Sequence, residues 1–216
     1  RVFFPVLSNL QENEDQFHST FLKVTSLLGM LSYTLAAILY VGADEIVIGL
    51  YGNQWSETIP LFELMILGAC NYPINAMIVN AFNAKGYARL NFKIGLIRKA
   101  LSLLPFILLI QYSLTEFLVA QIVVSFVSTL MNSTLLSHFV GVSFRAMIKD
   151  IYLPILPAGL FLAFYEIMLV EHVMNPGPII LSFVILIGLW LKLTANPGFG
   201  YFVEFAKSLK RKNQSE

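Results

Sequence analysis

Polar side chains that could contact a polar substrate lie inside long apolar stretches of this sequence. The clearest set is Gln121, Ser125, Ser128 and Asn132, whose spacing places them on one face of a helix. The other candidates for contact with a substrate are Arg98, Asn71, Asn75 and Tyr33. Because apolar surroundings leave a polar group without water, each of these side chains needs either a partner or a hydrated cavity.

Helix packing and a water-filled cavity are the two interpretations of these residues. Serine and glycine let helices approach closely and hydrogen-bond, at about 0.6 kcal/mol per contact, so those positions favour packing. For the four amide side chains both interpretations stay open. Arg98 and Lys99 lie deeper in their apolar stretch than the other cations, and for Arg98 the cost of a buried charge favours a cavity.

The sequence contains no catalytic constellation. His18, His138 and His172 are far apart, and no HExxH, P-loop, GxSxG or CxxC pattern occurs. The single cysteine, Cys70, excludes an internal disulfide and a multi-cysteine metal site. We therefore expect a protein that is not an enzyme and that needs no cofactor and no metal.

The composition is that of a membrane protein. Of the 216 residues, 57% are hydrophobic and 12% are charged, and the mean hydropathy is +0.73. A soluble domain has about 25% charged residues, so this chain has too few to cover a soluble surface.

Six apolar stretches are long enough to cross a membrane, which takes about 20 residues as a helix. They do not alternate in polarity, as barrel strands would, so we predict an all-α, polytopic transmembrane helix bundle. The second span contains Pro73, where we expect a kink. The six predicted spans are Val24–Ala43, Ile59–Phe82, Ile94–Tyr112, Phe117–Val140, Ile151–Val170 and Pro178–Thr194.

The basic residues all fall on one predicted side of the membrane. Of the 14 Lys and Arg residues, Arg1 belongs to the apolar start, and the other 13 lie in or near alternate connections on the same side. Lys and Arg concentrate in cytoplasmic loops, so this side is predicted to be cytoplasmic, together with the C-terminus. The stretch Asn80–Ala100, with five basic residues and no acidic one, is accordingly interpreted as a topology signal, and no nucleic acid partner is expected.

Three segments carry a resemblance to a known family. They are "FFPVLSNLQEN" (Phe3–Asn13), "LYGNQWSETIPLFELM" (Leu50–Met65) and "NAFNAKGYARLNFKIGLIRK" (Asn80–Lys99). They resemble, in the same order, a Pro-x-Leu/Phe-Ser helix end with its polar linker, a Phe/Tyr-Gly-x-x-Trp segment and an Ala-x-Gly loop. These features are typical of the Wzx/PST-type polysaccharide flippases, in the multidrug/oligosaccharidyl-lipid/polysaccharide exporter superfamily.

The resemblance implies a multi-pass protein of the bacterial inner membrane that serves polysaccharide or lipopolysaccharide biosynthesis in the cell envelope. The chain would be the C-terminal lobe of a two-lobed transporter about twice its length. The implied substrate is an undecaprenyl-linked oligosaccharide, moved from the inner to the outer leaflet by alternating access. A cation facing the cavity would suit its pyrophosphate, and Arg98 is the candidate. Membrane lipids and other glycan-assembly proteins are the expected partners.

The expected organisation has four parts. Residues 1–23 end a helix and form a cytoplasmic linker, residues 24–140 form four transmembrane helices, residues 141–195 form two extra ones, and residues 196–216 form a basic cytoplasmic tail. The tail is either a short amphipathic helix on the membrane or a solvated segment.

Two other functions remain as alternatives. A cation-coupled small-molecule (drug) exporter of the same superfamily would have an acidic residue deep in a span, whereas Glu63 and Glu166 lie near span ends. A membrane-embedded glycan polymerase or ligase would have a large external loop with Arg or His. The longest external connection predicted here, Asp44–Thr58, has neither.

Overall fold

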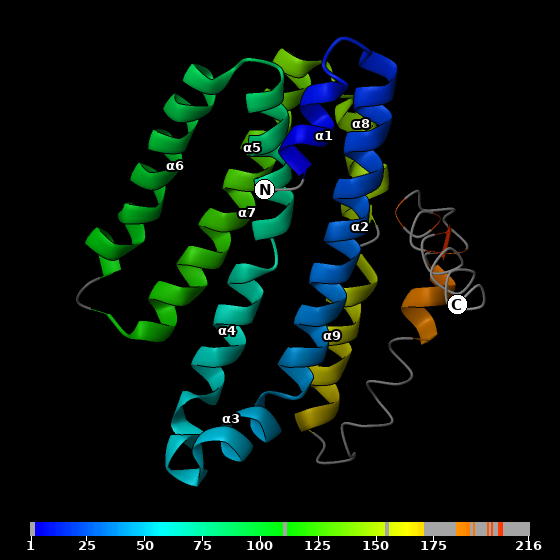
Figure 1. Cartoon of the computed structure of the whole chain (residues 1–216). Coiled ribbons are helices and arrows are strands. Elements are labelled where there is room, and N and C mark those ends of the chain that lie inside the picture. The colour runs from blue at the N-terminus through cyan, green and yellow to red at the C-terminus, as the bar shows by residue number, and fades with distance from the viewer. Residues whose placement is uncertain are drawn as a thin grey trace.

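The computed structural model describes residues 3–109, 112–153, 156–170 and 185–190, and single residues at 192, 198, 200, 203 and 204. Within the described residues every regular element is a helix, so the predicted all-α class is confirmed (Figure 1). The elements are α1 (Phe3–Asn9), α2 (Glu14–Val41), α3 (Ala43–Tyr51), η1 (Asn53–Thr58), α4 (Ile59–Ala69), α5 (Tyr72–Ala84), α6 (Ala88–Leu109), α7 (Leu114–Val140), α8 (Phe144–Met147), η2 (Ile148–Tyr152) and α9 (Leu156–Val170).

Three helical segments are long and apolar enough to cross a membrane: Glu14–Val41, Asn53–Ala84 and Leu114–Val140. A fourth is possible if Phe144–Tyr152 and Leu156–Tyr165, which meet at a bend of 41°, form one span. The chain is thus a multi-pass helix bundle, but the predicted count of six spans is not confirmed. Helix α6 has 22 residues but carries four cations, and most of the predicted span Pro178–Thr194 lies outside the described residues.

The connection between α1 and α2 is shorter than the predicted linker. We expected a polar segment up to Lys23, but α2 begins at Glu14 and extends over 28 residues. Asn13 caps this start, because its side-chain oxygen accepts a hydrogen bond from the backbone N–H of Gln16 at 3.1 Å. Glu14 and Asp15 lie in the first turn, where acidic side chains favour the helix dipole.

The second predicted span is divided into α4 and α5 by a break at Cys70 and Asn71. Pro73 accounts for this position, because its ring clashes with the carbonyl of the residue four places earlier and it has no N–H to donate. That earlier residue is Ala69, where α4 ends. The structure therefore agrees with the kink predicted at Pro73.

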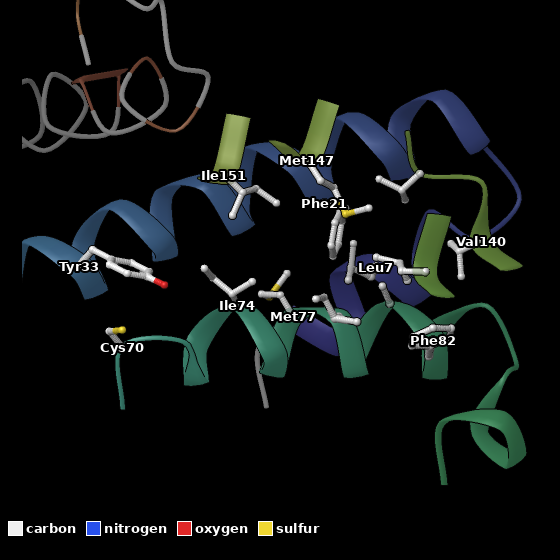
Figure 2. Packing of buried hydrophobic residues seen from close by; sticks show 14 of the residues in the cluster. Leu7, Phe21, Tyr33, Cys70, Ile74, Met77, Phe82, Val140, Met147 and Ile151 are labelled. Carbon is white, nitrogen blue, oxygen red and sulfur yellow. The ribbon is translucent and has the colours of Figure 1, made fainter. Parts of the chain in front are cut away.

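The hydrophobic core lies between α2 and α5 and is closed by α1, α8 and η2 (Figure 2). Phe21 of α2 and Ile74 of α5 are fully buried, and Leu7, Met147 and Ile151 reach the same cluster from the other elements. Burying one such side chain contributes about 1.5–3 kcal/mol where water is the alternative. This packing fixes the position of α5, and with it the break that separates α5 from α4.

The connections that carry basic residues meet at one end of the bundle. The Lys85 ammonium at the end of α5 donates to the carbonyl of Gln11 at 2.8 Å and lies 4.8 Å from the centre of the Phe17 ring. His18 Nε2 lies 3.1 Å from the carbonyl oxygen of Val140, at the end of α7. The loops after α1, α5 and α7 are therefore on one side, as the alternating topology requires, while α3 lies at the other end (Figure 1).

Candidate functional site

A cavity of about 590 Å³ lies between α4, α6 and α7, and we call it the α4–α6–α7 cavity. Helix α7 packs against both α4 and α6 and supplies one wall of the cavity. The polar side chains that line it are Asn75, Arg98, Lys99, Ser102, Gln121, Ser125 and Ser128. None of the described lining residues is acidic, so two cations set the charge of this cavity.

Helix α6 supplies the cations from a single face. Gly95, Arg98, Lys99 and Ser102 follow one another at i, i+3, i+4 and i+7, and all of them line the cavity. Arg98 is half-buried and Lys99 is exposed. The Nε atom of Arg98 is buried, and among the described residues no atom accepts a hydrogen bond from it. Arg98 therefore has one buried donor that the described residues leave without an acceptor.

Helix α7 contributes the stripe of polar residues that the sequence pattern placed on one face. Its N-terminal part lines the cavity, where Gln121 donates from Nε2 to the carbonyl of Ser102 at 2.8 Å and joins α7 to α6. Ser125 donates to the carbonyl of Gly68 at 3.4 Å and joins α7 to α4. Ser128 lies at the inner edge of the cavity, and the C-terminal part of the stripe, Thr129, Asn132 and Ser133, is buried between helices. Part of this stripe therefore lines a cavity and part of it packs between helices, which are the two interpretations that the sequence left open.

Asn75 connects the cavity to the packed part of the bundle. Its Nδ2 atom donates to Thr129 Oγ1 at 2.7 Å and to the carbonyl of Asn71 at 3.2 Å. Its Oδ1 atom accepts from Asn132 Nδ2 at 2.7 Å. Asn132 is only 2% exposed and does not line the α4–α6–α7 cavity. The Asn75 amide is therefore largely engaged in holding α5 to α7.

Asn71 and Tyr33 lie on the other side of the helix break. The Tyr33 hydroxyl donates to Asn71 Oδ1 at 2.5 Å, and Asn71 is fully buried. Tyr33 lines a second cavity of about 570 Å³ between α2, α4, α7 and α9, whose lining is almost entirely apolar. The structure therefore brings Arg98, Asn75 and Gln121 together and places Tyr33, Asn71 and Asn132 elsewhere.

Sequence reasoning missed Ser102 and Tyr72 as cavity residues. Ser102 could have been found, because it shares a helical face with Gly95 and Arg98. Tyr72, which is 68% exposed at the start of α5, carried no such signal. The side toward which its ring points depends on the helix break before Pro73, which helical spacing does not describe. Within the described part of the chain, no group of three or more His, Cys, Asp and Glu side chains could hold a metal ion.

Comparisons with known proteins point to polysaccharide biosynthesis. A family model described as "Polysaccharide biosynthesis protein" matches residues 1–60. This range includes the first segment that carried the resemblance and the beginning of the second. The lipopolysaccharide biosynthesis protein WzxC of Escherichia coli (strain K12) is 24% identical over 169 residues, which cover 71% of this chain and 32% of WzxC. The resemblance to the Wzx/PST-type family is confirmed.

The chain matches only about a third of the length of WzxC, so the activity and the substrate of the complete protein belong to the proposal below. No solved structure matches the chain.

Proposed function

We propose that this chain is part of a flippase that moves lipid-linked oligosaccharides from the inner to the outer leaflet of the bacterial inner membrane. The α4–α6–α7 cavity receives the anionic part of that substrate. The proposal rests on the relation to the Wzx/PST-type family and on one observation in the structure. That observation is a cavity with two cations, and no acidic residue among its described lining, within an apolar helix bundle.

The charge of the cavity suits a phosphate-linked substrate. A guanidinium group can donate two hydrogen bonds to phosphate oxygens, and an ammonium group adds a second charge. In apolar surroundings these interactions are less screened by water than at a protein surface. Arg98 and Lys99 therefore bind the linking phosphates from the α6 wall of the cavity.

The neutral polar side chains of the cavity suit sugar hydroxyls. Ser125 and Ser128 can accept as well as donate hydrogen bonds, and the side-chain oxygen of Gln121 can accept from a hydroxyl group. These residues come from α7, opposite the cations of α6. Alternating access, in which the cavity opens to one side of the membrane and then to the other, would carry the bound group across.

The test uses the full-length gene in a strain from which it and any redundant exporter have been deleted. We expect the deletion to leave undecaprenyl-linked oligosaccharide on the cytoplasmic leaflet. The double variant Arg98→Gln/Lys99→Gln should fail to restore delivery to the outer leaflet. Arg89→Gln is the matched control, because Arg89 lies on the same helix but is exposed and outside the cavity.

Two outcomes contradict the proposal. Normal delivery of every surface glycan in the deletion strain excludes a flippase. Normal delivery with the double variant, at wild-type protein levels, shows that transport does not need the cations of the cavity.

A further inference from the structure

The connection between α2 and α4 is a helical element that lies across the ends of these helices (Figure 1). The sequence predicted an external connection over Asp44–Thr58, but this segment folds into α3 and η1. Helix α2 and the segment Asn53–Ala84 are both long and apolar enough to cross a membrane. Their shared end must therefore lie at a boundary between lipid and water, and so must α3.

Helix α3 has an apolar face that begins under the bundle and continues beyond its edge. Ala43 and Val47 are buried, with 1% and 4% exposed. Leu50 and Tyr51 follow on the same face, at i+7 and i+8 from Ala43, and are 73% and 62% exposed. Since Ala43 and Val47 face the bundle, Leu50 and Tyr51 also point toward the membrane side of α3.

The two acidic residues of α3 lie at the edge of the apolar face and opposite it. Asp44 and Glu45 are exposed and are rotated by about 100° and 200° from Ala43, because each residue advances a helix by about 100°. Asp44 therefore lies at the edge of the apolar face, beside Tyr51, and Glu45 lies on the opposite side. The helix is amphipathic, with an apolar face toward the bundle end and the Glu45 carboxylate pointing away from it.

A sharp turn places a second aromatic ring beside Tyr51. Gly52 has φ +89° and ψ 168°, and its N–H donates to the carbonyl of Ile48 at 2.9 Å. The N–H of Trp55 donates back to the carbonyl of Gly52 at 3.1 Å. The rings of Tyr51 and Trp55 then lie 6.2 Å apart between centroids, and Trp55 is 50% exposed.

We propose that α3 and η1 form an interfacial anchor whose partner is the lipid bilayer itself. Leu50, Tyr51 and Trp55 insert at the level of the lipid headgroups, while Glu45 faces water. Tyr and Trp concentrate at this level because each has an apolar ring and a polar atom that stays hydrated. The anchor lies at the end of the bundle opposite the basic loops, and it does not depend on which substrate the protein moves.

Spin labels on the two faces of α3 test this proposal in the full-length protein, reconstituted in phosphatidylcholine vesicles. The starting protein carries Cys70→Ala and has no other cysteine. A single cysteine is then introduced as Leu50→Cys or as the matched control Glu45→Cys. Dissolved oxygen partitions into lipid, and a nickel chelate stays in water. We expect the ratio of oxygen to nickel collisions to be several-fold higher at position 50 than at position 45. Tyr51→Cys should behave as position 50 does.

Two results would overturn the anchor. If all three labels collide mainly with nickel, the whole element lies in water. If the labels at positions 50 and 51 are shielded from both reagents, protein covers this face instead of lipid.

Discussion

At the scale of single residues, the break between α4 and α5 is stabilised by side chains that replace missing helical hydrogen bonds. Ser32 donates to the carbonyl of Cys70 at 2.7 Å, and Ser125 donates to that of Gly68 at 3.4 Å. The thiol of Cys70 lies 2.9 Å from the carbonyl of Leu67. In lipid every backbone polar group needs such a partner. The small polar residues around the break therefore make an irregular backbone possible inside the membrane.

Replacing Ser32 with alanine tests this role. Ser32→Ala removes the donor to the Cys70 carbonyl and should lower the free energy of unfolding by about 1–3 kcal/mol. Thr134→Ala is the control, because the Thr134 hydroxyl is exposed and bonds only to the nearby carbonyl of Met131. Thermal unfolding of both variants in detergent checks the difference, and equal midpoints would contradict it.

Two amides that the sequence could not assign should separate into different roles. Asn75→Leu leaves Asn132 Nδ2 buried without its acceptor, so we expect a loss of stability of about 1–3 kcal/mol. Gln121→Leu removes one hydrogen bond at the cavity wall, so stability should change by about 0.6 kcal/mol while glycan delivery falls. Unfolding midpoints and delivery assays on both variants test this. The reverse pattern would place Asn75 in transport and Gln121 in packing.

At the scale of elements, the apolar stretches predicted the main helices, but the connections followed local rules that periodicity does not show. The kink before Pro73 was predictable, because a proline has a fixed effect four residues upstream. The helical connection α3–η1 was predicted only as an external segment. Its fold depends on a glycine conformation and on packing of Ala43 and Val47 against the bundle end.

The turn after α3 should not tolerate a side chain. Gly52 has φ +89°, and an added Cβ would lie 2.6 Å from Oε1 of Gln54. Gly52→Ala should therefore destabilise this turn, since a non-glycine residue in such a region costs about 1–3 kcal/mol. Gly49→Ala is the control on the same helix, where an added Cβ has no atom within 4 Å. Limited proteolysis of the α3–η1 segment should be faster only in Gly52→Ala, and equal cleavage of both variants would contradict the prediction.

At the scale of the whole molecule, the structure places the connections at alternating ends, while the orientation in the membrane remains a prediction from the basic residues. Reporter fusions test it. A fusion after Gly86, between α5 and α6, should be active only as a cytoplasmic reporter such as a fluorescent protein. A fusion after Trp55 should be active only as a periplasmic reporter such as alkaline phosphatase. The opposite result would show that these connections lie on the reverse sides of the membrane.

The site was only partly predictable at this scale. Helical spacing placed the polar residues of α7 on one face, and depth in the apolar stretch drew attention to Arg98 and Lys99, both of which line the cavity. Spacing could not show that Asn71 bonds to Tyr33 and Asn132 to Asn75, because these contacts join residues that are 38 and 57 positions apart. The other polar atom of each amide, Asn71 Nδ2 and Asn132 Oδ1, has no partner among the described residues. Such pairings depend on how the helices are placed around the break.

The exposed position of α6 has a mechanical consequence for the cavity. Among its residues with described side chains, only Ile94 and Pro105 are buried, and within the described part of the chain α6 packs mainly on α5 and α7. Helix α5 is held by the core, whereas α6 is mostly exposed, so we expect α6 to be the more compliant wall, with the turn at Gly86, where φ is +80°, as its pivot. This wall carries both cations. Any change in the width of the cavity therefore also shifts its electric field, and a bound anion would travel with the helix.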